Sequence, residues 1–283
     1  MPQSNVQGPT SKISLLRGQV IGFIGAGTMG QALIKGLLAQ GVSRAALRAA
    51  DASAATRRRV TRRFHIPIDA DNVAVARRSN IIVLAVKPQQ FPEVIQQLGP
   101  HVSRRQLVIT IAAGIRLRWL QARLPGVPLA RVMPNLPATV GYGFSAIALG
   151  RAVTARHQAQ VCALFSTVGR VAKLPERYFD AVTAVSGSGP AYVFFLVRAW
   201  EDAARLLGLP SPAASDAIRQ TLEGSVRLLR DSRLPASALI DKVASKKGTT
   251  EAALTVLARR RVAAHFAEAL RAATRRSKAL SWS

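Results

Sequence analysis

The chain has 283 residues, of which 49% are hydrophobic, and this composition excludes a disordered protein, a collagen-like repeat and a disulfide-stapled scaffold. The single cysteine, Cys162, excludes an intramolecular disulfide and a multi-cysteine zinc site, and it favours a cytoplasmic location. The 40 basic and 14 acidic residues give a net charge of +26. No apolar run reaches the roughly 18 residues that span a membrane, so we do not expect an integral membrane protein.

Residues 1–17 are polar and contain no apolar core of a secretory signal, so we expect a flexible tail. From residue 18 to residue 174, short apolar runs alternate with helical segments. The expected strands cover residues 20–24, 46–50, 81–86, 106–111, 129–133, 145–149 and 170–174. This alternation predicts an α/β domain with a doubly wound parallel sheet of the Rossmann type.

A glycine-rich loop follows the first expected strand and precedes a helical segment. Its residues are Gly25, Ala26, Gly27, Thr28, Met29 and Gly30. In a G-x-G-x-x-G loop the first glycine allows a tight turn, the second lets a pyrophosphate approach the backbone, and the third allows close packing. We therefore predict a nicotinamide dinucleotide site, with a glycine turn that binds no ligand as the alternative.

The cofactor of this site could be NAD or NADP. Asp51 ends the second expected strand, where an acidic side chain binds the ribose hydroxyls of NAD. Arg57 and Arg58 follow one helical turn later and could instead bind the 2′-phosphate of NADP. Charge alone leaves both cofactors open.

After Pro175 the strands end, and residues 175–283 are predicted to form an all-helical domain. One expected helix begins after Gly187-Ser188-Gly189, with Pro190 near its start, and ends at Gly208. Others cover about 213–230, 236–244 and 250–277. Several of these helices have wide apolar faces, which indicates a homodimer; the alternative is a self-contained bundle packed on the sheet.

Few side chains suggest acid–base or metal chemistry. The four histidines lack cysteine or carboxylate partners at metal-ligand spacing, so no metal site is predicted. Ser186 and Ser188 lie in a glycine-rich turn without the strand-to-helix context of a catalytic serine. A dinucleotide loop without an obvious acid–base pair favours hydride transfer, in which the protein mainly orients cofactor and substrate.

A polar loop in the helical half is the candidate substrate site. Its residues are Ser245, Lys246, Lys247, Gly248, Thr249 and Thr250, and they lead directly into a helix. Free amides at a helix start, together with hydroxyls and two lysines, can bind a carboxylate or a phosphate. The alternative is a loop with an ordinary N-cap threonine.

The arginines form short clusters inside amphipathic segments. Examples are residues 57–59 with 62–63, 104–105, 259–261 and 275–276. Aromatic residues, at 5%, do not interleave with them. This layout favours a solvated basic surface over a nucleic-acid interface.

Together these segments resemble the pyrroline-5-carboxylate reductase family over residues 20–279. The most specific matches are residues 186–192 and Gly248-Thr249-Thr250, and more general ones are residues 21–27, 84–89, 111–114 and 132–135. The resemblance implies an N-terminal Rossmann domain and a helical domain that interlocks with a partner subunit, with larger rings of dimers common. It also implies NAD(P)H-dependent reduction of 1-pyrroline-5-carboxylate, a cyclic imino acid, to L-proline.

The resemblance further implies roles for individual residues. The nicotinamide would lie beside Ala85, Val86, Lys87, Pro88, Ala112 and Ala113, and Asn72 would contact the adenosine half. The substrate would be bound by Ser245, Gly248, Thr249 and Thr250, with Glu176 at the border of its site. Thr250 would be the catalytic residue and, with water, would protonate the nitrogen.

Four features depart from the family pattern. Lys247 replaces a glycine, Lys242 an asparagine, Leu136 a threonine, and residues 259–261 a glycine-rich turn. If position 247 requires a positive φ, lysine costs about 1 kcal/mol there. The departures leave two alternatives open: a reductase of another cyclic imino acid, and a nucleotide-binding protein without turnover that contacts polyanions.

Overall fold

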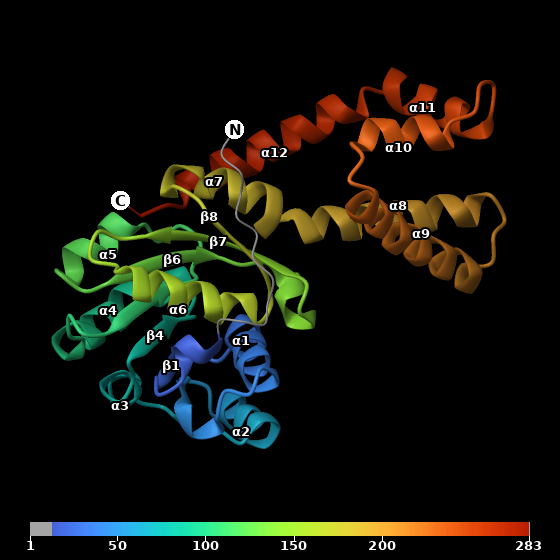
Figure 1. Cartoon of the computed structure of the whole chain (residues 1–283). Coiled ribbons are helices and arrows are strands. Elements are labelled where there is room, and N and C mark those ends of the chain that lie inside the picture. The colour runs from blue at the N-terminus through green and yellow to red at the C-terminus, as the bar shows by residue number, and fades with distance from the viewer. Residues whose placement is uncertain (1–12, 283) are drawn as a thin grey trace. The chain divides into compact units, whose positions relative to one another are not determined.

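The computed structural model describes residues 13–282, so residues 1–12 of the expected tail lie outside the described residues. The described chain forms two compact units (Figure 1). The first contains the described residues up to Ser188 together with the C-terminal segment from Ala273, and the second is Gly189–Ala272. This division falls at Ser188, whereas the loss of strand pattern suggested a boundary near Pro175.

Within the described residues, an eight-stranded sheet forms the centre of the first unit. Its strands are β1 (Ile21–Ile24), β2 (Leu47–Ala50), β3 (Ile68–Asp69), β4 (Ile81–Leu84), β5 (Leu107–Thr110), β6 (Leu129–Met133), β7 (Gly143–Leu149) and β8 (Gly169–Lys173). The order is β3-β2-β1-β4-β5-β6-β7-β8, and of the described pairs only β6–β7 is antiparallel. The predicted Rossmann-type sheet is confirmed; the pattern missed β3, which is very short.

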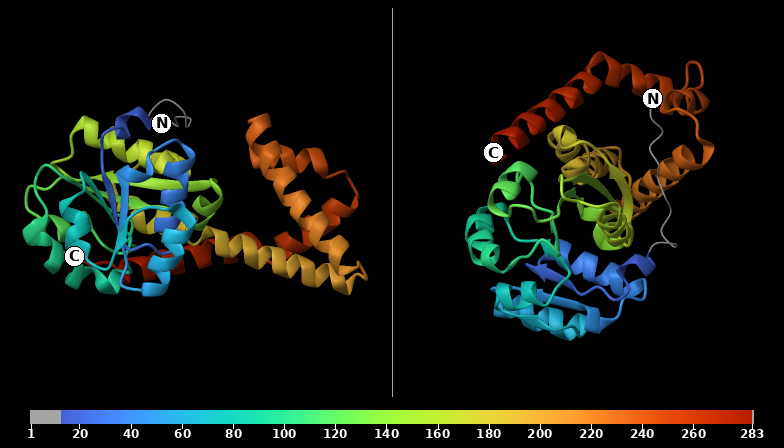
Figure 2. Two further views of the ribbon diagram at one scale, coloured as in Figure 1. Left: turned by 90° about the horizontal axis from the view of Figure 1, so that it is seen from below. Right: turned by 60° about the vertical axis from the view of Figure 1, so that its left-hand side comes forward.

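Helices pack on both faces of the sheet because its central strands are apolar on both sides. Every residue of β1, β4 and β5 is buried. One face carries α1 (Thr28–Ala39), α2 (Ala54–Phe64) and α6 (Ala155–Ser166), and the other carries α3 (Asn72–Arg77), α4 (Phe91–Leu98) and α5 (Leu117–Arg123) (Figure 2). Continuous apolar runs predict parallel strands that are covered in this way.

The described part of the expected tail is not loose. Ile13–Leu16 forms a short 3-10 helix, and the Leu16 side chain is buried in the core that contains Leu33 of α1. Gln160 of α6 donates a hydrogen bond from Nε2 to the Leu15 carbonyl oxygen at 3.4 Å. The prediction of a flexible tail up to residue 17 is therefore wrong for these residues, because burial of an apolar side chain holds them on the domain.

The helical half begins inside the first unit. A 3-10 turn, Glu176–Tyr178, leads into α7 (Phe179–Val182), a π-helical turn (Thr183–Gly187) and α8 (Gly189–Leu206). Pro190 lies in the first turn of α8, as predicted. The π-helical turn before it was not predicted.

The π-helical turn lies where a missing backbone donor meets a side chain from a distant loop. Pro190 has no N–H group, so the carbonyl oxygen of Ser186 lacks the hydrogen bond that a regular helix would provide. The side-chain amide of Asn135, in the loop after β6, lies 3.3 Å from that oxygen and 3.2 Å from the Ser186 hydroxyl. A side chain that inserts into the helical hydrogen-bond ladder accounts for irregular turns of this kind.

The second unit is helical throughout. It contains α8, α9 (Ser211–Ser232), α10 (Ala236–Val243), α11 (Thr249–Arg259) and most of α12 (Val262–Ala279). Several large apolar side chains on α8 are exposed, among them Phe194 and Phe195. Among the described helices, the segment Glu176–Leu206 is long and apolar enough, by length and composition, to span a membrane. The sequence pattern missed this segment because Thr183, Ser186, Ser188 and the glycines beside them break the apolar run, although no charged residue lies between Asp180 and Arg198.

Candidate active site

The glycine-rich loop lies at the carboxyl end of β1. Strands β2 and β3 extend to one side of β1, and β4 to β8 extend to the other. In doubly wound sheets, ligands bind outside the carboxyl ends of the strands at the point where the strand order changes side. The topology therefore places this loop where a ligand is expected.

The glycines of the loop have separate steric roles. Gly25 has a φ of +93°, and a Cβ there would lie 2.7 Å from the carbonyl oxygen of Ala85. A Cβ on Gly30 would lie 2.8 Å from the carbonyl oxygen of Gly25. At Gly27, in contrast, a Cβ would have no atom within 4 Å. Gly25 and Gly30 thus keep the loop compact, and the open space at Gly27 fits a phosphate group that approaches the backbone.

The start of α1 offers unpaired backbone donors. Gly27 is the N-cap residue and provides no side-chain cap, and its carbonyl oxygen accepts from the Gln31 amide at 2.9 Å. The amides of Thr28, Met29 and Gly30 therefore precede the regular hydrogen-bond ladder. Such a helix start carries partial positive charge. The loop fits the diphosphate of a nicotinamide dinucleotide.

Asp51, at the end of β2, contacts the glycine loop itself. Its Oδ2 accepts from the Ala26 amide at 2.9 Å, and its Oδ1 accepts from the Ser53 amide at 2.9 Å. Arg57 donates from Nη1 to the carbonyl oxygens of Asp51 and Ala52, at 2.8 and 2.9 Å. Asp51 and Arg57 thus shape the turn after β2. The Asp51 carboxylate retains lone pairs that a ribose hydroxyl can use.

Arg58 is placed differently from Arg57. Its side chain is exposed, and it lines a cavity of about 450 Å³ beside α2 together with Ala54 and Arg57. Ala54 begins α2 directly after the turn that Asp51 shapes, so this cavity adjoins the end of β2. Because Arg57 is held by two carbonyl oxygens, Arg58 is the better placed of the two arginines to bind a 2′-phosphate.

The residues expected beside the nicotinamide follow two neighbouring strands. They are Ala85, Val86, Lys87 and Pro88 after β4, and Ala112 and Ala113 after β5. Strands β4 and β5 are parallel, with Leu84 beside Thr110, so both segments emerge at the same edge of the sheet. Ala85 is also the residue that Gly25 approaches. The fold therefore brings these segments and the glycine loop together.

Asn72 lies on the other side of the loop, at the first residue of α3. Its Nδ2 donates to the Gln97 side chain at 3.3 Å. Just before Asn72 in the chain, at the end of β3, the Asp69 carboxylate accepts hydrogen bonds from the Asp71 and Ala70 amides, and these bonds lower the pKa of Asp69. Because β3 pairs with β2, while the nicotinamide segments follow β4 and β5, Asn72 is on the side expected for an adenosine contact.

The predicted substrate loop lies in the second unit. Lys247 has a φ of 58°, so this position requires the left-handed conformation that glycine adopts more easily. A Cβ on Gly248 would lie 2.3 Å from the Ser245 hydroxyl oxygen and 3.0 Å from the Ser245 carbonyl oxygen. Any side chain at Gly248 would therefore displace Ser245.

Helix α11 begins directly after Gly248 and has no side-chain cap. The amides of its first turn are therefore available as donors, and Thr249 and Thr250 add two hydroxyls. Neither hydroxyl has a hydrogen-bond partner within residues 13–282. The Glu251 carboxylate accepts from the Lys247 amide and so occupies one donor of the loop. The remaining donors form a nest that suits a small carboxylate.

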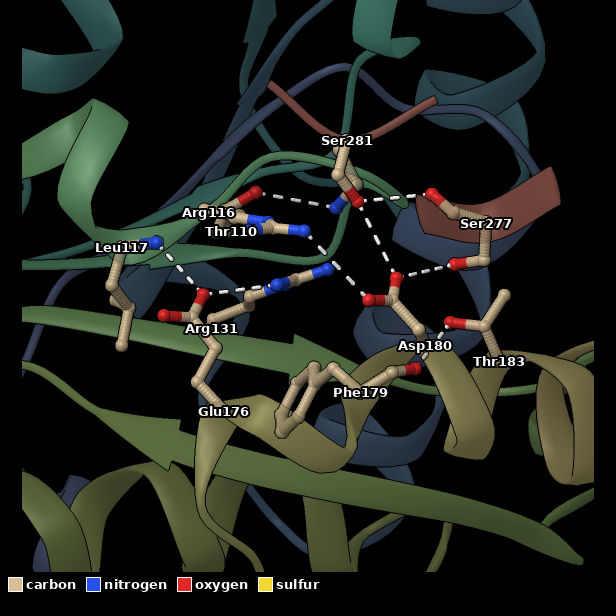
Figure 3. Close-up of polar contacts among 11 residues, drawn as sticks. Thr110, Arg116, Leu117, Arg131, Glu176, Phe179, Asp180, Thr183, Ser277 and Ser281 are labelled. Carbon is tan, nitrogen blue, oxygen red and sulfur yellow. Dashed lines mark hydrogen bonds and ion pairs between the residues drawn. The ribbon is translucent and has the colours of Figure 1, made fainter. Parts of the chain in front are cut away.

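Glu176 contacts the sheet of the first unit. Its Oε1 accepts from Arg131 Nη1 at 2.9 Å and from the Leu117 amide at 2.8 Å (Figure 3). Arg131 lies in β6 with 3% exposure, and its guanidinium is 4.8 Å from the centre of the Phe179 ring. Sequence reasoning missed Arg131. The available signal was an arginine in an otherwise apolar strand, because a buried guanidinium requires a counter-charge.

Asp180 fixes the C-terminal segment to the first unit. Its Oδ1 accepts from the hydroxyls of Ser277 at 2.8 Å and Ser281 at 3.4 Å, and Arg116 lies 3.8 Å from its Oδ2 (Figure 3). These contacts explain why the end of α12 belongs to the sheet-containing unit.

The other departures from the family pattern lie at the surface. Arg261 has a φ of 54° at the turn between α11 and α12, so a conformation that favours glycine persists there with an arginine. Lys242 and Leu136 are exposed. No group of three or more His, Cys, Asp or Glu side chains among the described residues could hold a metal ion.

Comparison with known proteins shows two family matches. Residues 176–280 match the family described as pyrroline-5-carboxylate reductase dimerisation, and residues 20–114 match the family described as NADP oxidoreductase, coenzyme F420-dependent. The chain is 40% identical over 263 residues to the pyrroline-5-carboxylate reductase of Pseudomonas aeruginosa, and the match covers 92% of this chain and 96% of that protein. It is 38% identical over 261 residues to that of Synechocystis sp., covering 92% and 97%.

Solved structures give the same result. A pyrroline-5-carboxylate reductase from Coxiella burnetii has a TM-score of 0.87 at 30% identity, and the match covers 94% of this chain and 99% of that one. A pyrroline carboxylate reductase from Plasmodium falciparum with NADP bound has a TM-score of 0.86 at 28% identity, again covering 94% and 99%.

Proposed function

The chain belongs to the pyrroline-5-carboxylate reductase family, and we propose that it reduces the C=N bond of 1-pyrroline-5-carboxylate to give L-proline, with NADPH or NADH as the reductant. This reaction is the last step of proline biosynthesis. The observation that carries the proposal is the combination, in one chain, of an open dinucleotide loop at Gly27 with an uncapped helix start at Thr249 and Thr250. The first suits a diphosphate, and the second suits a small carboxylate.

The residues assigned to the cofactor lie along the edge of the sheet where the parallel strands have their carboxyl ends. The loop from Gly25 to Gly30 holds the diphosphate, Asp51 and Asn72 contact the adenosine half, and the segments after β4 and β5 orient the nicotinamide. When bound, the reduced nicotinamide supplies a hydride to the substrate carbon. The NADP bound to the related Plasmodium falciparum enzyme supports this assignment.

The substrate assignment rests on the α11 loop. Its amides and the hydroxyls of Ser245, Thr249 and Thr250 bind the carboxylate and the ring nitrogen, and Gly248 allows the close approach. Lys246 and Lys247 add positive charge that attracts an anionic substrate. Orientation of the reacting carbon is the main catalytic contribution, and it can lower a barrier by about 7–11 kcal/mol.

Thr250 is the proposed catalytic residue, since a hydroxyl next to the ring nitrogen can hold or pass on a proton. A protonated imine is already electrophilic, so no stronger acid is required. Glu176 has a positioning role in this assignment. Its Oε1 is occupied by Arg131 and by the Leu117 amide, so this oxygen holds neighbouring protein groups and not the substrate.

We propose a homodimer as the minimal assembly, with larger homo-oligomers built from it. The exposed Phe194 and Phe195 lie within the segment that matches the dimerisation family. Their burial against a second copy would contribute about 25 cal/mol per Å² of apolar surface. We accordingly interpret the apolar segment Glu176–Leu206 as an interface within a cytoplasmic enzyme, with neither a membrane nor a nucleic acid as partner.

Lys247 supports a second candidate substrate. Position 247 keeps the left-handed backbone that suits the family's glycine, but lysine adds a side chain beside the nest. That side chain changes the space available to the ring, so another cyclic imino acid would be reduced by the same chemistry.

The test is an NAD(P)H-oxidation assay with 1-pyrroline-5-carboxylate and with its six-membered analogue, with proline formation measured as product. Preferred turnover of the five-membered ring supports the proposal, and preferred turnover of the six-membered ring supports the second candidate. If neither imine is reduced while NADPH still binds, the chain is instead a nucleotide-binding protein without turnover.

A further inference from the structure

A second polar cavity of the first unit lies between α1, α2 and the 3-10 segment Leu136–Val140. Its volume is about 330 Å³, within the range of small-molecule sites. Its polar lining consists of Thr28, Gln31, Lys35, Arg59, Arg63 and Thr139. No carboxylate is among the residues that line it.

Helical periodicity directs three cationic side chains to this cavity. On α1, Lys35 follows Thr28 at seven residues, which is two helical turns along the same face. On α2, Arg59 and Arg63 are four residues apart and therefore neighbours. The two helices lie side by side (Figure 1), so their positive charges meet across the cavity.

These three cations have no acidic partner. Within residues 13–282, no carboxylate lies within 4.0 Å of Lys35, Arg59 or Arg63. Arg59 reaches only the Thr56 hydroxyl at 3.4 Å, and Arg63 lies 5.1 Å from the centre of the Phe64 ring. Three like charges around one cavity repel each other, and an anion placed between them would relieve this repulsion.

We propose that the cavity binds a small phosphate-bearing anion of about the size of pyrophosphate, at a site separate from the one that holds the cofactor. The planar guanidinium groups of Arg59 and Arg63 suit bidentate contacts with phosphoryl oxygens, and the Lys35 ammonium adds a third charge. The hydroxyls of Thr28 and Thr139 can donate further hydrogen bonds. Thr28 also belongs to the dinucleotide loop, so the two sites meet at this residue.

The experiment is calorimetric titration of the full chain with inorganic pyrophosphate at constant ionic strength, with and without saturating NADP⁺. In the free chain pyrophosphate can also occupy the cofactor loop, so the binding event assigned to this cavity is the one that we expect to persist when NADP⁺ is bound. The double variant Arg59→Gln/Arg63→Gln should raise the Kd at least about tenfold, because each lost contact is a charge-assisted hydrogen bond. The double variant Arg118→Gln/Arg151→Gln removes the same charge from exposed positions outside the cavity and should leave the Kd unchanged.

Three results would overturn the proposal. Loss of all pyrophosphate binding in the presence of NADP⁺ would assign the binding to the cofactor loop, and equal weakening in both double variants would show attraction by net charge alone. Binding of a short single-stranded oligonucleotide, but not of pyrophosphate, through Arg59 and Arg63 would identify a nucleic-acid surface instead. If the Arg59→Gln/Arg63→Gln variant fails to fold, Lys35→Gln, which removes an exposed side chain, applies the same criteria.

Discussion

The side-chain amide of Asn135 contacts Ser186, 51 residues later in the chain, at both its carbonyl and its hydroxyl oxygen. The side-chain oxygen of Asn135 accepts from the Phe144 amide at 2.9 Å, so both ends of this amide are used. Because Pro190 cannot donate to Ser186, Asn135 satisfies a carbonyl group that would otherwise be unpaired. The contact holds the π-helical turn against the loop after β6.

Replacement of Asn135 by alanine should therefore destabilise the protein. Asn135→Ala leaves the Ser186 carbonyl and the Phe144 amide without partners, which should lower the free energy of unfolding by about 1–3 kcal/mol. Urea denaturation measures this change. Gln89→Ala, at an exposed position, is the control and should change stability by less than about 0.5 kcal/mol. Equal stabilities of the two variants would contradict the assigned role.

Removal of Glu176 should have a larger effect. Glu176→Ala leaves the Arg131 guanidinium buried without its counter-charge, and loss of one partner of a buried pair costs about 3–5 kcal/mol. Asp231→Ala breaks a highly exposed pair with Arg230 and should cost less than about 1 kcal/mol. Denaturation of both variants in urea makes the comparison. A cost at Glu176 no greater than that at Asp231 would show that Arg131 is stabilised in another way.

Lys247 should be a position where glycine stabilises the fold. Lys247→Gly removes the steric cost of a left-handed φ at a non-glycine residue, and the net gain after the added chain entropy should be about 0.5–1 kcal/mol. Lys246→Gly is the matched control, since Lys246 does not have a positive φ, and it should lower stability. The Tm of each variant checks the signs. A lower Tm for Lys247→Gly would show that the lysine side chain makes a compensating contribution.

The proposed substrate site predicts a kinetic effect at Thr250. Thr250→Ala should lower kcat/KM for 1-pyrroline-5-carboxylate at least tenfold, or by about 1.4 kcal/mol of transition-state stabilisation. Thr255→Ala, on the same helix, removes a hydroxyl that bonds to the Glu251 carbonyl oxygen and should leave the kinetics unchanged. Steady-state rates at saturating NADPH decide the matter. Unchanged rates for Thr250→Ala would remove this threonine from the catalytic assignment.

Arg58 should distinguish the two nicotinamide cofactors. Arg58→Gln removes a guanidinium beside the end of β2 and should raise the KM for NADPH about fivefold, near 1 kcal/mol, without changing the KM for NADH. The control is Arg118→Gln, an exposed change of the same charge on α5. Equal effects on both cofactors would mean that Arg58 does not contact the 2′-phosphate.

Local sequence was sufficient to predict every described strand except the two-residue β3, together with the glycine loop and the helix start near Thr249. Each depends on neighbours in the chain: continuous apolar runs specify strands covered on both sides, and G-x-G-x-x-G between a strand and a helix specifies a turn that leaves amides free. At Lys247 the sequence only raised the question of a positive φ, since the matching family carries glycine there, and the folded chain answers it with a φ of 58°.

Tertiary structure alone decided which polar groups meet. Arg131 and Glu176 are 45 residues apart, and Asn135 and Ser186 are 51 apart, so no local period relates them. Likewise, Lys35 joins Arg59 and Arg63 only because two helices pack on the same face of the sheet. Helix and strand propensities and hydrophobic periodicity depend on residues a few positions apart. A polar group that is buried on folding needs a hydrogen-bond partner, and that partner can come from any part of the chain. These pairings therefore cannot be read from local sequence.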